Sequence, residues 1–129
     1  MKKTLLSLLF LSFFAYQANA QQISESAEKR IALITRVMAA ELGLNESEYI
    51  RLKSLNRERI VKGDEISEFY NNNPDLKTRK LMELEASFDK KFKAMLNPIQ
   101  LAAYAAYKHD PESDLALKEK DKTANTTQK

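Results

Sequence analysis

The chain contains no cysteine and no tryptophan, only two glycines and a single histidine among its 129 residues. Without cysteine it can form no disulfide and carry no cysteine-linked lipid. Two glycines are too few for many strands joined by tight turns, which favours an all-α fold. No cysteine nucleophile or glycine-rich phosphate loop is present, and one histidine offers little to a Ser/His/Asp arrangement. We therefore predict a protein that is not an enzyme and needs no cofactor.

The first twenty residues have the three zones of a secretory signal peptide. Lys2 and Lys3 supply positive charge, residues 5–14 are almost wholly apolar, and residues 18–20 (Ala-Asn-Ala) offer small side chains to a peptidase. We predict cleavage before Gln21 and a periplasmic location. The apolar run is shorter than the roughly 20 residues that cross a bilayer. A retained membrane anchor is therefore the weaker alternative, and no stable membrane insertion is expected.

Much of the basic charge belongs to this leader. Without Lys2 and Lys3, 19 basic residues stand against 18 acidic ones, a net charge of +1. A nucleic-acid-binding protein would keep a concentrated basic surface after processing, so no nucleic-acid partner is expected. The remaining residues leave room for one domain with a modest core, which we predict at residues 21–110. Residues 111–129 are mostly polar and are predicted to form a disordered tail.

Apolar residues recur at three- and four-residue steps in four segments, which predicts helices at about residues 24–42, 45–70, 75–95 and 97–110. The second and third helices would be about 39 Å and 32 Å long, and the short break between them predicts a long antiparallel hairpin. The predicted apolar positions are Ala27, Ile31, Ile34, Met38 and Leu42 in the first helix, Tyr49, Leu52, Leu55, Ile66, Phe69 and Tyr70 in the second, and Leu81, Leu84, Phe88, Phe92 and Met95 in the third.

A five-residue pattern occurs twice, each time before a predicted helix. It consists of a leucine, a capping asparagine, two variable positions and then Glu or Gln. Such a pattern is typical of a capping box, in which the side chains of the asparagine and of the Glu or Gln accept hydrogen bonds from backbone N–H groups at the helix start. The leucine packs against the helix as a hydrophobic staple. Because any helix can begin this way, the pattern also fits a purely structural role. The residues are Leu44, Asn45 and Glu48, and Leu96, Asn97 and Gln100.

An exported, cysteine-free helical chain with this pair of motifs resembles the Spy/CpxP-like family of periplasmic proteins, whose hallmark is a repeated Leu-Thr-x-x-Gln motif. The resemblance covers about residues 24–110. Asparagine replaces threonine in both copies here, and Glu48 replaces glutamine in the first. The resemblance implies a homodimeric, cradle-shaped helical protein that binds unfolded client chains without ATP in the envelope stress response. Its alternatives are a regulatory partner of an envelope sensor kinase and a metal-responsive accessory protein.

The second predicted helix carries the candidate client-binding residues. Ile50 and Val61 share a face separate from its main apolar stripe, and Arg59 interrupts that stripe between Leu55 and Ile66. Arg57 and Lys62 add basic character. A surface that mixes apolar and basic side chains suits unfolded chains, whose exposed stretches are apolar and often acidic. The alternatives are a dimer interface, ordinary core packing with scattered surface aliphatic residues, and a solvated charged face.

The single histidine, His109, lies near the acidic residues Asp110, Glu112 and Asp114. One imidazole with carboxylates would make only a weak metal site, so we predict no metal ligand. We expect His109 instead to complement the negative C-terminal end of the fourth helix.

Overall fold

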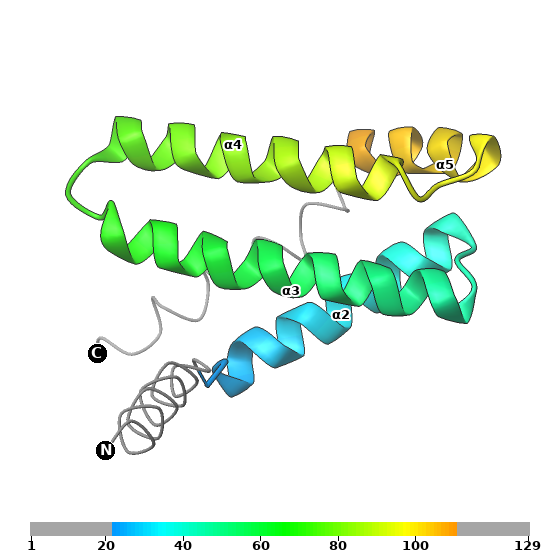
Figure 1. Ribbon diagram of the computed structural model, residues 1–129, viewed down its shortest axis with the longest axis horizontal. Coiled ribbons are helices and arrows are strands. Elements are labelled where there is room, and N and C mark those ends of the chain that lie inside the picture. Colours follow the sequence, from blue (N-terminus) through cyan, green and yellow to red (C-terminus); the bar gives the residue numbers. More distant parts are fainter. Residues whose placement is uncertain (1–21, 111–129) are drawn as a thin grey trace, which may run out of the picture.

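The computed structural model describes residues 22–110, and this part of the chain folds into four α-helices without a strand (Figure 1). The helices are α2 (Glu25–Leu42), α3 (Glu46–Phe69), α4 (Pro74–Lys93) and α5 (Pro98–His109). The predicted all-α fold with four helices is confirmed for these residues. The predicted signal peptide at residues 1–20 and the predicted tail at residues 111–129 lie outside the described residues.

Each helix begins at a side chain that accepts a hydrogen bond from a first-turn N–H group. Ser24 Oγ accepts from the amide of Ala27 at 3.2 Å, and Asn73 Oδ1 accepts from the amide of Leu76 at 3.1 Å. Helix α2 is followed by Gly43, whose φ of 61° is left-handed, the conformation typical of a glycine cap. These local signals place the helix boundaries within one or two residues of the predicted ones.

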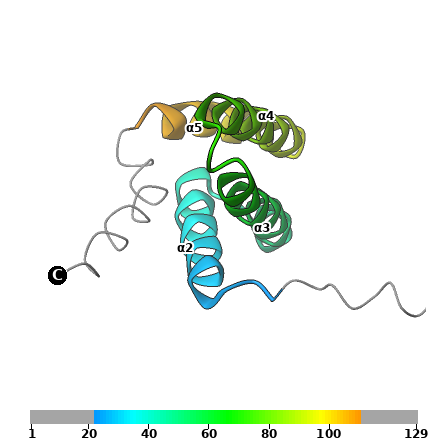
Figure 2. The same ribbon diagram turned by 90° about the vertical axis from the view of Figure 1, so that its left-hand side faces the viewer.

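Helix α3 lies in the middle of the fold, with α2 on one side and α4 on the other (Figure 2). The turn at residues 70–73 joins α3 to α4 at one end, and the two helices lie side by side (Figure 1). Helix α5 packs against α2 near the opposite end. At the end with the turn, α3 and α4 extend past α2 and α5 (Figure 1). No helix within residues 22–110 has the length and apolar character to cross a bilayer.

The core is assembled from all four helices. The predicted face of α2 is buried throughout, and Phe88 and Phe92 of α4 are buried as predicted. The Phe92 ring meets the Tyr104 ring of α5 edge-on, with centroids 4.9 Å apart. The buried hydrophobic residues are Ala27, Ile31, Ile34, Met38, Leu42, Leu52, Ile60, Phe88, Phe92 and Tyr104.

The predicted apolar stripe of α3 is correct only in part. Leu52 is buried and Leu55 packs against the core, but the Phe69 residue is 81% exposed. Phe69 belongs to the predicted apolar stripe but is not buried, because the last turns of α3 extend beyond α2 and α5 and neither of these helices covers them (Figure 1).

Candidate functional site

Both copies of the repeated motif form complete capping boxes, as predicted. Asn45 Oδ1 accepts from the amide of Glu48 at 3.0 Å, and the Glu48 carboxylate accepts from the amide of Asn45 at 2.9 Å. In the second copy Asn97 and Gln100 exchange the equivalent bonds, at 2.9 Å and 3.0 Å. The motif leucines Leu44 and Leu96 are partly buried and pack against the core.

The two motif copies also contact each other, which the sequence did not predict. Gln100 Nε2 donates a hydrogen bond of 2.9 Å to Glu48 Oε2. That same carboxylate oxygen accepts from the amide of Asn45, while Gln100 Oε1 accepts from the amide of Asn97. Gln100 is buried. One continuous set of hydrogen bonds therefore joins the first turn of α3 to the first turn of α5.

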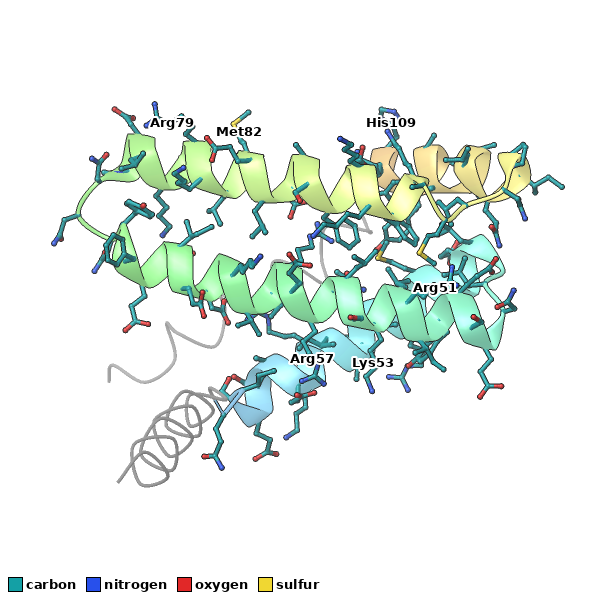
Figure 3. All side chains as sticks on the ribbon, in the orientation of Figure 1. Arg51, Lys53, Arg57, Arg79, Met82 and His109 are labelled. Atoms are coloured by element: carbon teal, nitrogen blue, oxygen red, sulfur yellow. The ribbon has the colours of Figure 1, made fainter. Side chains whose placement is uncertain are left out.

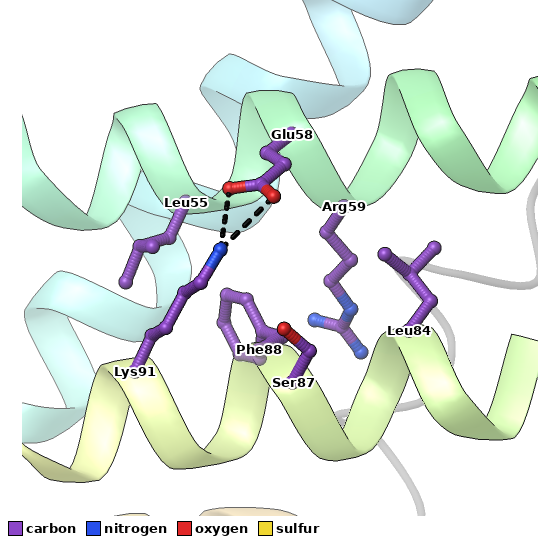
Figure 4. A pocket seen from close by; sticks show the side chains of 7 residues that line it. All are labelled: Leu55, Glu58, Arg59, Leu84, Ser87, Phe88 and Lys91. Atoms are coloured by element: carbon purple, nitrogen blue, oxygen red, sulfur yellow. Dashed lines mark hydrogen bonds and ion pairs between the residues drawn. The ribbon is translucent and has the colours of Figure 1, made fainter.

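Among the candidate client-binding residues, Arg59 is committed to a contact between α3 and α4. Its guanidinium bonds the Glu85 carboxylate through two nitrogens, at 2.6 Å and 2.8 Å. The guanidinium carbon lies 4.5 Å from the centre of the Phe88 ring (Figure 4). Only 13% of the Arg59 side chain is exposed. Arg59 thus meets a carboxylate on an apolar surface, an arrangement that stabilises the packing of the two helices.

Next to Arg59, a second ion pair joins the same helices. Lys91 Nζ on α4 lies 3.0 Å and 3.1 Å from the two carboxylate oxygens of Glu58 (Figure 4). Lys62 also bonds Glu58, at 2.8 Å. Hydrogen bonds from Lys62 and Lys91 lower the pKa of Glu58. The cavity among these side chains measures about 10 Å³, space for one water and no larger ligand.

The other candidate residues face different neighbours. Arg57 bonds Glu28 of α2 through two nitrogens, at 2.7 Å and 3.2 Å, and points toward α2 (Figure 3). Val61 is half-buried and lines a surface hollow together with Ile23 and Ala27. Ile50 is 61% exposed. The five residues therefore do not form one surface, because α3 is covered by α2 on one side and by α4 on another.

Sequence patterns missed a buried polar pair between α2 and α3. Thr35 Oγ1 donates to the carbonyl of Ile31 at 2.6 Å and accepts from Asn56 Nδ2 at 3.1 Å. Asn56 Oδ1 is buried and has no hydrogen-bond partner within the described residues. Leu52, Asn56 and Ile60 are the buried residues of α3. Their four-residue spacing indicates a common buried face of the helix. The polar Asn56 between two apolar residues obscured this pattern in the sequence.

A second missed cluster surrounds Asp89 on α4. Its carboxylate accepts from the Tyr104 hydroxyl at 3.0 Å and from Lys108 at 2.8 Å, and pairs with Lys93 at 2.8 Å. Partial burial alone would raise the pKa of Asp89, but the hydrogen bonds from Lys108, Lys93 and Tyr104 lower it to about 2. Burial and the bond to Asp89 raise the pKa of the Tyr104 hydroxyl. The cluster holds α5 against α4.

His109 is exposed in the last turn of α5, beside Lys108, where positive charge complements the helix C-terminus (Figure 3). Within residues 22–110 no group of three or more His, Asp or Glu side chains is arranged to hold a metal ion. Glu112 and Asp114, which were considered with His109, lie outside the described residues. Comparison with known proteins finds no family model, no curated protein and no solved structure that matches this chain.

Proposed function

We propose that the protein is an ATP-independent, chaperone-like protein of the cell envelope, of the Spy/CpxP-like type, that binds unfolded or misfolded client chains under stress. In this proposal α3 and α4 act as a long antiparallel hairpin, and two copies of the chain form a cradle. Binding relies on reversible contact with apolar and charged side chains. The candidate client contacts are Ile50, Val61, Arg57, Arg59 and Lys62.

The observation that carries the proposal is the exposure of Ile50 on the central helix of the fold. Helix α3 packs on both α2 and α4, yet Ile50 remains 61% exposed. Its neighbour Arg51 is also exposed and makes no ion pair within the described residues. An apolar side chain beside an unpaired guanidinium offers an unfolded chain both an apolar contact and a partner for an acidic group.

The ion pairs of α3 indicate which candidate residues can most easily exchange their partner for a client carboxylate. Arg59 is mostly buried in its pair with Glu85, whereas the side chains of Arg57 and Lys62 are about half exposed and pair with Glu28 and Glu58. Exposed ion pairs contribute at most about 1 kcal/mol, so a client carboxylate can replace Glu28 or Glu58 at little cost. We therefore assign the first contacts to Ile50, Arg57 and Lys62.

The test is suppression of aggregation of a chemically denatured client in buffer without ATP. The wild-type protein should reduce light scattering in proportion to its molar ratio, and Ile50→Ser should weaken this protection. Met82→Ser is the matched control, because Met82 is also exposed but lies on α4 and points away from α3 (Figure 3). Circular dichroism should show both variants folded. A folded wild-type protein that protects no client at any ratio would refute the proposal.

Export is the second part of the proposal and rests on the sequence of residues 1–20. Cleavage before Gln21 should give a mature protein recoverable from the periplasmic fraction. Intact mass spectrometry of that fraction measures the N-terminus directly. Recovery of a chain that still carries residues 1–20 would contradict the proposed processing.

A further inference from the structure

The most exposed aromatic side chain among the described residues lies at the projecting end of the α3–α4 pair. Phe69 is 81% exposed, and its ring meets that of Tyr70 edge-on at 4.9 Å. Ile66 lies one helical turn before Tyr70. These three residues line an open hollow together with Glu65 and Glu68. We call this surface the tip and define it by Glu65, Ile66, Glu68, Phe69 and Tyr70.

The rim of the tip is negative. Glu65 and Glu68 are exposed, and neither makes an ion pair within residues 22–110. They lie near the C-terminal end of α3, where the helix dipole already creates negative potential. The last turn of α3 contains no basic residue. By contrast, α4 and α5 place Lys90, Lys93 and Lys108 in their last turns, where positive charge stabilises the helix end.

Neither feature of the tip helps this chain to fold. An acidic residue at a helix C-terminus opposes the dipole by a few tenths of a kcal/mol, and an exposed aromatic ring gains little from apolar burial. The other strongly exposed hydrophobic residues, Ile50, Met82 and Ile99, do not line this hollow. An apolar hollow with a negative rim is complementary to an apolar segment that carries positive charge.

We propose that the tip binds an unfolded polypeptide segment in which aliphatic or aromatic residues are interspersed with lysine or arginine. The apolar side chains of the segment pack on Ile66, Phe69 and Tyr70. Its cations lie near Glu65 and Glu68 and over the exposed face of Phe69, where a cation–π contact adds to the ion pair. This site is distinct from the Ile50 surface, has the opposite charge preference and does not depend on the proposed chaperone function.

The experiment measures fluorescence anisotropy of two labelled, unstructured peptides built from glycine, serine, leucine and phenylalanine. One peptide carries three lysines, and the other carries three glutamates at the same positions. The wild-type protein at low salt should bind the lysine peptide about tenfold more tightly than the glutamate peptide. Phe69→Ala should weaken binding of the lysine peptide about tenfold. The Glu65→Gln/Glu68→Gln variant should remove the difference between the two peptides.

Met82→Ala is the matched control, because Met82 is an exposed hydrophobic residue that points away from α3 on α4 (Figure 3). It should leave both affinities unchanged. Equal binding of the two peptides, no binding of either, or equal losses in Phe69→Ala and Met82→Ala would each overturn the proposal. Sedimentation gives one further outcome: if Phe69→Ala converted a dimer into a monomer, the tip would be a contact between copies instead. A folded wild-type protein that protects no denatured client would overturn the proposed function but leave the peptide result intact.

Discussion

Gln100 at the start of α5 donates its side-chain amide to the carboxylate of Glu48 at the start of α3, 52 residues earlier in the chain. In this contact Glu48 supplies the acceptor and Gln100 the donor, so the two motif positions are complementary. An ionised Glu48 accepts from the amide of Asn45 and from Gln100 at once, at 2.9 Å each. Hydrogen bonds to a charged acceptor are stronger than those between neutral groups. The pair of motifs thus joins two helix starts.

The first prediction is that Glu48 and Gln100 are energetically coupled. In a double-mutant cycle of Glu48→Ala and Gln100→Ala, urea denaturation should give a coupling free energy of about 1 kcal/mol, since the bond involves a charged acceptor and a buried donor. Asn73→Ala removes the cap of α4, which makes no contact with Gln100 among the hydrogen bonds of the described residues. Its combination with Gln100→Ala should be additive. Additivity of Glu48→Ala and Gln100→Ala would contradict the coupling.

The second prediction concerns the two caps themselves. Asn45→Ala and Asn97→Ala should each lower the free energy of unfolding by about 1 kcal/mol, because each removes the acceptor for a first-turn amide. Asn72→Ala is the control. It changes an exposed asparagine in the turn between α3 and α4 and should alter stability by less than about 0.5 kcal/mol. Equal denaturation midpoints for all three variants would show that the motif does not stabilise the helix starts.

These caps show which features the sequence could predict. A capping box joins residues three positions apart, so Asn45 with Glu48 and Asn97 with Gln100 can be recognised without knowledge of the tertiary structure. The contact between Glu48 and Gln100 requires α5 to return beside the start of α3. Nothing within a single motif specifies that arrangement.

The same distinction applies to α3 as a whole. A helix that packs on one neighbour has one apolar face, but α3 packs on α2 through Asn56 and on α4 through Leu55 and Arg59. Its apolar pattern is therefore broad and interrupted by polar residues. The position of Arg59 within the stripe was predicted correctly, whereas its partner Glu85 lies on another helix and could not be predicted from α3 alone. The assignment of client contacts remains a prediction.

The third prediction tests Arg59 as a contact between helices. Arg59→Ala should lower the free energy of unfolding by about 1–3 kcal/mol, because it removes a mostly buried side chain with two bonds to Glu85 and a contact with Phe88. Arg59→Lys should restore only part of the loss, since an ammonium group cannot form both bonds and stack on the ring. Arg79→Ala is the matched control, because Arg79 is exposed on the side of α4 away from α3 (Figure 3).

Stability measurements on these Arg59 variants separate two roles. If Arg59→Ala unfolded at the same urea concentration as the wild-type protein, the contacts with Glu85 and Phe88 would contribute nothing to folding. Arg59 would then be free to serve as a client contact, as the sequence predicted. A loss of stability in Arg59→Ala with little change in Arg79→Ala would assign it to the interface of α3 and α4.

The last prediction follows from the pKa of Asp89. Its folded-state pKa of about 2 lies below the ordinary value of 3.8. The unfolded chain therefore binds a proton at higher pH than the folded one, and the carboxylate contributes stability above about pH 4 that is lost as the pH falls toward 2. The Asp89 side chain is 23% exposed, so solvent screening reduces this contribution to about 1–2 kcal/mol.

Asp89→Asn keeps an acceptor for the Tyr104 hydroxyl but removes the charge that Lys93 and Lys108 stabilise. Urea denaturation at pH 7 should show the variant to be less stable than the wild-type protein by about 1–2 kcal/mol. The difference should shrink by about half at pH 3, where the unfolded wild-type chain is mostly protonated at this position. Glu65→Gln removes an exposed carboxylate without an ion pair in the described residues and should show no such pH dependence. A difference between Asp89→Asn and the wild-type protein that stayed constant from pH 7 to pH 3 would mean that the charge of Asp89 does not hold α5 in place.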